Sequence, residues 1–387
     1  MPDKRTIAIA TGTRADWGLL SPVARGLASR PDCEVSILAT NMHLIPEYGD
    51  TIREIEADGF ADVVRVEMPV DTDTPLATVK AMSGCMEGMA RELTRLRPDL
   101  IVILGDRFEM LATATAALMT GTPIVHIAGG EISEGAVDDS IRHAITKMAS
   151  LHLTATEPYR RRVVAMGEEP GRVINTGAIG VWNMLHAPRM TRRELEESIG
   201  FTLPEGSLLV TYHPATLDPE DPAVRCRALL DALDRFPDSH VLITYPNNDA
   251  RGRVIIEMIE RHAAERPDRV RVIPSLGRAR YITALECVSA VVGNSSSGIV
   301  EVPSMGIPTV DVGMRQRGRL AGPSVIHCGD STDEIAGAIA SALTPEGQET
   351  ARTSPNPYAK ADTLDIMVRA IAETPLDTLR HKKFHDI

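Results

Sequence analysis

Carboxylic acids cluster in the first half of the chain at positions where they could perform acid–base chemistry. Asp106 follows an apolar run, Glu131 follows a pair of glycines, and Asp138 and Asp139 open a stretch with helical spacing of apolar residues. Carboxylates that share one cleft can have their pKa values pushed apart, which supplies an acid and a base. The alternative for the last pair is structural, with Asp138 as the N-cap of the helix and Asp139 favouring its dipole.

A metal site is a weaker interpretation of the same region. His126 and Glu131 lie near these acids, but the chain contains neither a His-Glu-x-x-His motif nor a Cys-x-x-Cys pair. An odd number of scattered cysteines argues against a disulfide framework and for a reducing compartment. They are Cys33, Cys85, Cys226, Cys287 and Cys328.

The second half contains a segment rich in serine and glycine. Ser295, Ser296 and Ser297 follow an apolar run and precede a helical stretch expected to start near Ile299. Backbone amides and hydroxyls at a helix N-terminus suit a phosphate or pyrophosphate, although the serines could also simply cap the helix. Glu301, about one turn further on, could accept hydrogen bonds from a ribose diol.

Two other polar residues follow apolar runs. Arg14 could contact a ligand phosphate or pair with Asp16, and His213 could act as a donor or acid–base group or be structural. Neither Gly-x-Gly-x-x-Gly nor Gly-Lys-Ser/Thr appears, which disfavours dinucleotide redox chemistry and ATP hydrolysis. The Gly-x-Ser-x-Gly nucleophile elbow is also missing.

All these residues follow short aliphatic runs that are themselves followed by helical stretches. Uninterrupted apolar runs of this length are typical of parallel strands covered on both faces. The pattern predicts an α/β protein with two doubly wound halves, whose ligands bind beyond the carboxyl ends of the strands. The predicted strands are residues 6–10, 35–39, 100–104, 123–127, 208–212, 241–245, 270–273, 290–292, 309–312 and 325–327.

The predicted domains are residues 1–180, residues 181–355 and a C-terminal helix and tail over 356–387. A helix in the stretch between the halves is marked by a capping box, Thr191 with Glu194, and by a stop at Gly200. The apolar residues Met367 and Ile371 have helical spacing, so the last segment could pack back on either half, for example the N-terminal one.

Composition restricts the partners. The 387 residues are 43% hydrophobic and 24% charged, with a net charge of −12 and no polybasic stripe, which argues against nucleic acid. No apolar run approaches the roughly 18 residues that suggest a membrane span, and the N-terminus does not resemble a signal peptide. We therefore expect a soluble, cytoplasmic protein without a membrane partner.

In this order, the residues resemble the UDP-N-acetylglucosamine 2-epimerase family, and specifically its hydrolysing branch, which opens sialic-acid-type biosynthesis. The segment 138–143 resembles the hydrolysing enzymes, since the non-hydrolysing ones carry a different acidic helix start. The resemblance covers most of the chain and rests on residues 12–16, 105–109, 129–131, 138–147, 213–214, 246–247 and 293–298 with Glu301.

The resemblance implies a GT-B fold, in which two Rossmann-like halves face a central cleft and the second holds the nucleotide, and it implies no cofactor. Asp106 and Asp138 match catalytic acids of the family. The positions that match ligand-binding residues are Arg14, Arg107, His213, Asn247, Ser295, Ser296, Ser297, Glu301 and Arg315. A homodimer or homotetramer is also implied.

One departure affects the chemistry. Relatives with His-Ile-Glu-Gly-Gly-Glu carry a catalytic glutamate where this chain has Ala128, so its function must be absent, altered or taken over, and Glu131 is the nearest candidate. The family reaction converts UDP-N-acetylglucosamine and water to N-acetylmannosamine and UDP, by elimination to a glycal and hydration.

Three alternatives remain open from the sequence. UDP-N,N'-diacetylbacillosamine could be the substrate of the same chemistry. A GT-B glycosyltransferase would share the phosphate and ribose sites but would need an acceptor. A non-catalytic nucleotide-sugar-binding protein would explain Ala128.

Overall fold

The computed structural model describes residues 4–45, 51–60, 62–69, 74–133, 137–214, 221–246 and 252–386. The chain forms two compact units. The first comprises Met1–Glu131, Val137–Trp182 and Lys360–Ile387, and the second comprises Ile132–Ala136 and Asn183–Ala359. The C-terminal segment therefore belongs to the unit that the N-terminal residues begin.

The described strands of the first unit form one parallel sheet in the order β3-β2-β1-β4-β5-β6-β7. This is the Rossmann order with one strand added at an edge. The strands are β1 (Arg5–Thr11), β2 (Cys33–Thr40), β3 (Asp62–Val66), β4 (Leu100–Leu104), β5 (Ile124–Ile127), β6 (Leu151–Thr154) and β7 (Val173–Asn175).

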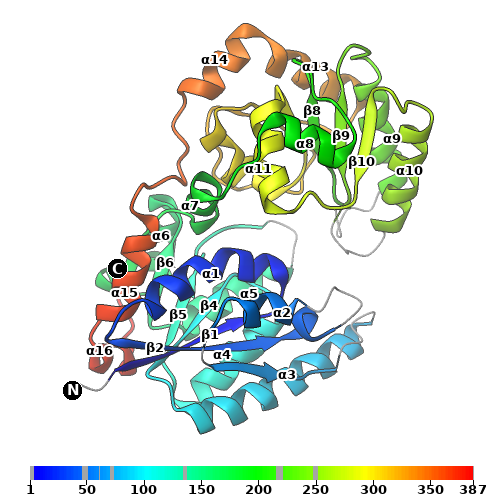
Figure 1. The fold of residues 1–387 in the computed structure, drawn as a ribbon. Helices are drawn as coiled ribbons and strands as arrows, with labels where there is room; N and C mark the ends of the chain where they lie inside the picture. The colour runs from blue at the N-terminus through cyan, green and yellow to red at the C-terminus, as the bar shows by residue number, and fades with distance from the viewer. Residues whose placement is uncertain are drawn as a thin grey trace. The chain divides into compact units, whose positions relative to one another are not determined.

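Helices cover both faces of this sheet (Figure 1). They follow the strands because each parallel crossover needs a connection of a dozen or more residues. They are α1 (Arg14–Ala28), α2 (Ile52–Ala57), α3 (Pro75–Leu96), α4 (Phe108–Thr120), α5 (Val137–Met148) and α6 (Glu157–Ala165), with short 3-10 turns at η1 (Asn41–Leu44) and η3 (Pro170–Arg172). Helix α7 (Ile179–His186) contains the boundary between the units, which falls between Trp182 and Asn183.

The apolar runs of the strands supply two core clusters, one on each face of the first sheet. In β1, Ile7 and Ile9 join the cluster that contains residues of α1, whereas Ala8 and Ala10 join the one that contains residues of α3 and α4. Successive side chains of a strand point to opposite faces, so a strand that is apolar throughout must be covered on both.

The C-terminal helices α15 (Thr363–Glu373) and α16 (Leu376–Arg380) complete the first of these clusters. Met367 and Ile371 of α15 and Leu379 of α16 are buried in it. Helix α15 lies beside α1 (Figure 1), and Gly26 allows this approach, because a Cβ atom there would lie 2.7 Å from Val368 Cγ2.

The second unit repeats the architecture. Its described strands form a parallel sheet in the order β10-β9-β8-β11-β12-β13. They are β8 (Leu208–Thr211), β9 (Val241–Thr244), β10 (Val270–Ile273), β11 (Ala290–Gly293), β12 (Thr309–Val312) and β13 (Val325–Cys328). Its helices are α8 (Arg192–Ile199), α9 (Pro222–Leu233), α10 (Gly252–Ala264), α11 (Gly277–Cys287), α12 (Ser296–Val300), α13 (Thr332–Leu343) and α14 (Pro345–Thr353), with a 3-10 turn at η4 (Val302–Met305).

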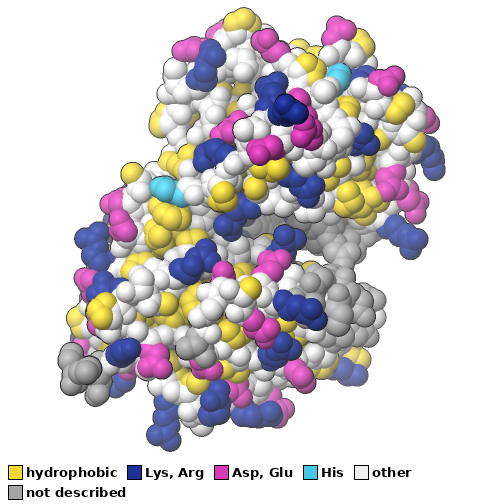
Figure 2. All heavy atoms as spheres, viewed as in Figure 1, with side chains coloured by type: hydrophobic (Ala, Val, Ile, Leu, Met, Phe, Trp, Pro, Cys, Tyr) yellow, Lys and Arg dark blue, Asp and Glu magenta, His cyan; other side chains and the backbone are white. Residues whose placement is uncertain are grey.

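The predicted α/β class with two doubly wound parallel sheets is confirmed. All ten predicted strands are present, and α8 has the expected capping box, with Gly200 in the left-handed conformation at its C-terminus. Strands β3, β6 and β7 were not predicted. Among the described residues, no helix combines the length and apolar character that crossing a bilayer requires. On the face seen in Figure 2, acidic and basic side chains are interspersed.

Replacing Ile371 with alanine should selectively weaken the first unit. The substitution leaves a cavity under α15 and should lower the free energy of unfolding by about 2 to 5 kcal/mol. Both tryptophans, Trp17 and Trp182, belong to the first unit, so urea denaturation followed by tryptophan fluorescence reports on it. Arg369→Ala on the exposed side of the same helix is the control. Equal midpoints for the two variants would show that α15 does not stabilise this unit.

Candidate active site

The predicted functional residues follow the strands at which each sheet reverses its order. In the first sheet the order reverses between β1 and β4, which lead into Gly12 and Asp106. In the second it reverses between β8 and β11, which lead into His213 and Asn294. At such a switch point the connections after the two strands lead to opposite faces of the sheet. Open α/β sheets bind their ligands there, beyond the carboxyl ends of the strands.

Arg142 of α5 joins the acids of the first unit. Its side chain is only 3% exposed, and its guanidinium pairs with the carboxylate of Asp106 and lies 3.5 Å from that of Asp139. It also donates to the backbone carbonyl of Glu131 over 3.0 Å. A guanidinium removed from water requires such partners, so one side chain connects the ends of β4 and β5 with α5.

Asp138 and Glu131 occupy different surroundings. Asp138 is exposed in the first turn of α5, which begins at Val137, so the alternative that it caps the helix is wrong. Its charge interacts with that of Arg107. The Glu131 residue is partly exposed. The structure thus places Asp106 beside Arg142 and the charge of Asp138 near Arg107, and Arg142 also contacts the backbone of Glu131.

A second group of carboxyls lies behind Arg107. Its Nε lies 2.6 Å from Oε1 of Glu109, whose side chain is fully buried in the first turn of α4. The other oxygen of Glu109 has no hydrogen-bond partner among the described residues. A Cβ atom on Gly12 would lie 2.5 Å from Glu109 Oε1, so any larger residue there would displace the Glu109 side chain.

Asp16 in the first turn of α1 shares this environment. It accepts a hydrogen bond from the Gly12 amide over 3.4 Å, while Thr13 caps the helix by accepting from the Asp16 amide. Burial and the nearby charge of Glu109 raise the pKa of Asp16 to about 6. The sequence interpretation missed Asp16 and Glu109 as site residues.

Arg14 does not pair with Asp16 as one interpretation supposed. It is exposed on α1, and its Nε lies 3.5 Å from a carboxylate oxygen of Glu54. Because such an exposed pair contributes little stability, Arg14 is easily released to another anion.

His126 also has a structural role that the sequence interpretation missed. It is fully buried at the end of β5, where one ring nitrogen lies 2.8 Å from the carbonyl of Gly105 and the other 3.1 Å from the hydroxyl of Thr146. Burial lowers its pKa to about 4, so the ring is neutral, with Nε2 donating to the carbonyl and Nδ1 accepting from the hydroxyl. The ring therefore connects β4 with α5.

Ala128 has an unusual backbone conformation. Its φ is 67°, in the left-handed region, and its amide donates to the Leu153 carbonyl. Gly130 has φ 81°, and a Cβ atom there would lie 2.6 Å from the carbonyl oxygen of Tyr159. The segment after β5 therefore turns sharply, at a cost of about 1 kcal/mol for a residue with a side chain.

In the second unit, His213 and Asn294 connect the two strands at the switch point. The His213 amide donates to Asn294 Oδ1 over 2.7 Å, and Asn294 Nδ2 donates to the His213 carbonyl over 2.8 Å. Arg315 and Gln316 donate to the Asn294 carbonyl over 3.0 and 2.9 Å. Burial and the charge of Arg315 lower the pKa of His213 to about 3, so its imidazole is neutral.

The serine segment begins a helix earlier than predicted. Helix α12 starts at Ser296 rather than near Ile299, and Ser295 at its N-cap position makes no side-chain capping bond among the described residues. The hydroxyl of Ser297 lies 2.9 Å from that of Tyr281. Glu301 follows one turn later, with its amide bonded to the Ser297 carbonyl. The predicted site residue Asn247 lies outside the described residues.

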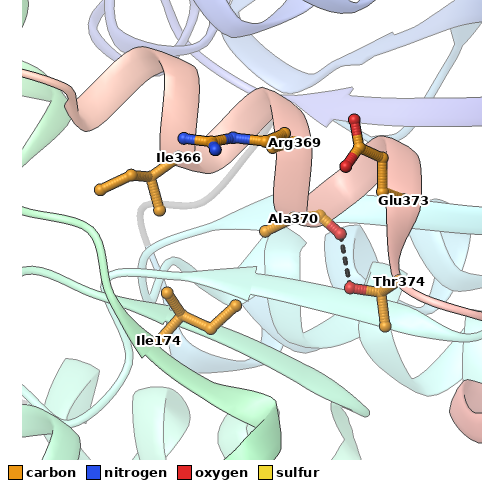
Figure 3. A pocket seen from close by; sticks show the side chains of 6 residues that line it. All are labelled: Ile174, Ile366, Arg369, Ala370, Glu373 and Thr374. Carbon is orange, nitrogen blue, oxygen red and sulfur yellow. Dashed lines mark hydrogen bonds between the residues drawn. The ribbon is translucent and has the colours of Figure 1, made fainter.

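One cavity of about 360 Å³ lies elsewhere in the first unit, between β7 and α15 (Figure 3). It is lined by Ile174, Ile366, Arg369, Ala370, Glu373 and Thr374. None of these is a predicted site residue. Within the described ranges, no three His, Cys, Asp or Glu side chains converge as metal ligands would.

Two Rossmann-like parallel sheets with polar groups at both switch points define a GT-B type α/β protein. A family model described as UDP-N-acetylglucosamine 2-epimerase matches residues 25–372. The chain therefore belongs to the UDP-N-acetylglucosamine 2-epimerase family, and the predicted resemblance is confirmed.

Two relatives match over nearly the whole chain. The GDP/UDP-N,N'-diacetylbacillosamine 2-epimerase (hydrolyzing) of Campylobacter jejuni is 32% identical and covers 99% of this chain and 100% of its own. The polysialic acid biosynthesis protein P7 of Escherichia coli is 33% identical, covering 99% and 98%. The crystal structure of UDP-GlcNAc 2-epimerase from Neisseria meningitidis bound to UDP-GlcNAc superposes with a TM-score of 0.81 at 16% identity, covering 95% of this chain and 100% of that one.

Replacing Asp16 with asparagine should stabilise the protein at pH 7.5. Because its pKa is raised in the folded state, ionisation of Asp16 opposes folding as the pH rises from about 4 through about 6. Removing the charge should therefore raise the free energy of unfolding by about 1 kcal/mol at pH 7.5 and much less at pH 4.5, a modest gain because the side chain is partly exposed.

Urea denaturation at the two pH values measures this difference. Glu54→Gln, which neutralises an exposed acid paired with Arg14, is the control and should change stability little at either pH. A stabilisation by Asp16→Asn that does not depend on pH would contradict the raised pKa.

Proposed function

We propose that this protein is a hydrolysing UDP-N-acetylglucosamine 2-epimerase that converts UDP-N-acetylglucosamine and water to N-acetylmannosamine and UDP. The observation that carries the proposal is the ion pair between Arg142 and Asp106, formed where β4 and β5 end and α5 passes. It gathers several acids at a switch point without a metal ligand set among the described residues. The Campylobacter jejuni relative is named as a hydrolysing 2-epimerase, which supports this branch.

The first unit supplies the acid–base groups. A base removes the proton from carbon 2 as the bond from carbon 1 to the UDP oxygen breaks, which leaves a 2-acetamidoglycal and UDP. Water then adds its oxygen to carbon 1, and an acid returns a proton to carbon 2 with inverted configuration. We assign these proton transfers to Asp106, Glu131 and Asp138, and Arg142 holds Asp106 in a fixed orientation.

The second unit supplies the nucleotide site. The backbone of His213 bonds to the side-chain amide of Asn294, Arg315 donates to the Asn294 carbonyl, and the serines follow directly after Asn294. Arg315 offers a charge to the pyrophosphate, and the neutral imidazole of His213 can donate to it or move a proton. Ser295, Ser296 and Ser297 add hydroxyl donors, Glu301 accepts from the ribose, and Arg14, Arg107 and Asn247 complete the proposed substrate-binding set.

UDP-N,N'-diacetylbacillosamine is a second candidate substrate for the same reaction. The name of the relative from Campylobacter jejuni favours it, and the two sugars differ at carbons 4 and 6, remote from the bonds that break. The same acids would therefore serve both substrates. Incubation with each UDP-sugar, with products followed by NMR, decides between them.

Turnover in deuterated water should give a free sugar with one deuterium at carbon 2 and inverted configuration there. The reason is that elimination breaks the carbon–hydrogen bond and hydration forms it again with a proton from solvent. Water labelled with heavy oxygen should place its label in the sugar and not in UDP. Mass spectrometry and NMR measure both, without any acceptor present.

The control is the product incubated with enzyme and UDP in deuterated water, which corrects for later exchange. Protium retained at carbon 2 would exclude elimination and leave a simple hydrolase. Release of UDP only after an acceptor is added would indicate a glycosyltransferase instead.

Glu131→Gln should reduce turnover by at least about a hundredfold, which is the contribution typical of a general acid or base. It replaces the carboxyl closest in sequence to Ala128, the position at which the family resemblance implies a glutamate. UDP affinity measured by calorimetry should not change, because the proposed nucleotide site lies in the second unit. Glu67→Gln, which changes an exposed glutamate of the first unit, is the matched control. Normal turnover in Glu131→Gln would return both proton transfers to Asp106 and Asp138.

A further inference from the structure

The C-terminal tail after α16 lies against the segment around Gly167 in the first unit. The Gly167 carbonyl accepts from the His385 amide over 3.0 Å, and Arg172 donates to the His381 carbonyl over 3.5 Å. The ring of Phe384 lies 5.0 Å from the ammonium of Lys147. Leu379 anchors the start of the tail in the core. These contacts hold the tail along a definite path.

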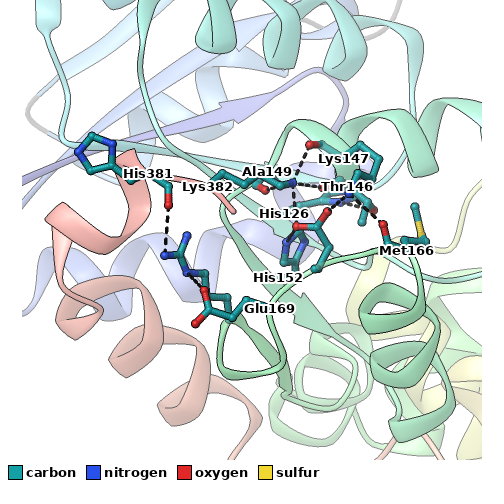
Figure 4. Close-up of polar contacts among 11 residues, drawn as sticks. His126, Thr146, Lys147, Ala149, His152, Met166, Glu169, His381 and Lys382 are labelled. Carbon is teal, nitrogen blue, oxygen red and sulfur yellow. Dashed lines mark hydrogen bonds and ion pairs between the residues drawn. The ribbon is translucent and has the colours of Figure 1, made fainter. Parts of the chain in front are cut away.

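Lys382 of this tail caps the C-terminus of α5. Its ammonium donates to the carbonyls of Lys147 and Ala149 over 2.6 and 2.7 Å, and it lies 3.4 Å from that of Thr146 (Figure 4). The last carbonyls of a helix have no partners within the helix, and the negative end of its dipole attracts a cation. A lysine from the C-terminal tail therefore supplies the hydrogen-bond donors that these carbonyls lack within the helix.

Glu168 fixes the ammonium from the other side. This glutamate is 2% exposed, and its carboxylate lies 2.7 Å from Lys382, 2.5 Å from Lys147 and 3.0 Å from His152. Burial alone would raise its pKa, but hydrogen bonds from these three side chains lower the pKa to about 2. The carboxylate is thus charged at neutral pH and requires its cationic partners.

The cap is connected to the candidate active site through α5. Thr146, whose carbonyl faces Lys382, bonds through its hydroxyl to His126, and His126 bonds to the carbonyl of Gly105. Gly105 immediately precedes Asp106, which pairs with Arg142 one turn earlier in α5. The position of α5 therefore determines where Arg142 meets Asp106.

We propose that Lys382 is a positioning residue for the acids of the active site, because it holds the C-terminal end of α5 in the place that Arg142 and Asp106 require. The expected effect on turnover rests on the proposed function, whereas the expected effect on α5 does not. Without the ammonium, the helix loses its cap and Glu168 loses one of its cationic partners. The end of α5 should then loosen, and the Arg142–Asp106 pair should be held less precisely.

The informative variant is Lys382→Met, which keeps the length of the side chain and removes its charge and donors. Lys383→Met is the matched control, because it removes the same charge from the exposed neighbouring residue. Hydrogen exchange followed by mass spectrometry should show at least about tenfold faster exchange over residues 142–149 in Lys382→Met alone. Lys382→Arg, which keeps a cation and donors, should restore most of the protection.

Kinetics separate positioning from general loss of stability. Lys382→Met should lower kcat by about ten- to a hundredfold, the effect expected of a misplaced catalytic group. UDP affinity, measured by calorimetry at a temperature where both variants are folded, should equal that of Lys383→Met. If Lys382→Met does not fold, Lys382→Gln, which keeps donors for the carbonyls, is measured in the same way.

Exchange over residues 142–149 that is the same in the Lys382 and Lys383 variants would overturn the proposal. Faster exchange with unchanged kcat would also overturn it, since α5 would then be free to move without consequence for the acids. If the wild-type protein turns over neither UDP-sugar, the proposed function fails, and the exchange comparison alone decides whether Lys382 holds α5.

Discussion

The first unit is organised around one buried cation, which requires anions and hydrogen-bond acceptors as partners. Arg142 is almost entirely removed from water, and an uncompensated charge in such a place would cost several kcal/mol. Its partners come from the loop after β4, the segment after β5 and the first turn of α5. The helix can deliver the guanidinium there only if it is held in place, and His126, Thr146 and the C-terminal tail hold its C-terminal end. The buried positive charge of Arg142 thus determines where the acids around it lie.

In the second unit, neutral groups connect the loops at the switch point. There the side-chain amide of Asn294 forms a closed pair of hydrogen bonds with the backbone of His213, so the loops after β8 and β11 are fastened to each other. Arg315 and Gln316 then reach the same residue through its carbonyl. In the second sheet, the strand order separates these two loops at the switch point, and the hydrogen bonds between His213 and Asn294 reconnect them. Two motifs that are 81 residues apart in the sequence are thereby joined.

Much of the fold could be predicted from the sequence, because strands buried on both faces must be apolar throughout. Strands β3, β6 and β7 escaped prediction for physical reasons. The first contains the exposed Arg65, the second contains His152, whose burial depends on Glu168, and the third has only three residues. The proposed site residues follow apolar runs, which made them visible as candidates in the sequence. Asp16, Glu109 and His126 were not identified, because their roles arise from burial and distant partners, which one sequence does not display. For Asp16 and Glu109, the signal in the sequence is Gly12, which lies close to both of their side chains.

The chain leaves the first unit near Trp182 and returns to it at Lys360, and this path has a consequence for biosynthesis. Residues of α15, α16 and the tail are synthesised after the second unit, although they complete the core that β1 and α1 begin. The second unit, in contrast, has all of its helices and strands before Lys360. During translation it can therefore finish folding while the first unit still exposes the apolar surface that Ile371 and Leu379 will cover. The first unit is thus begun before the second and completed after it.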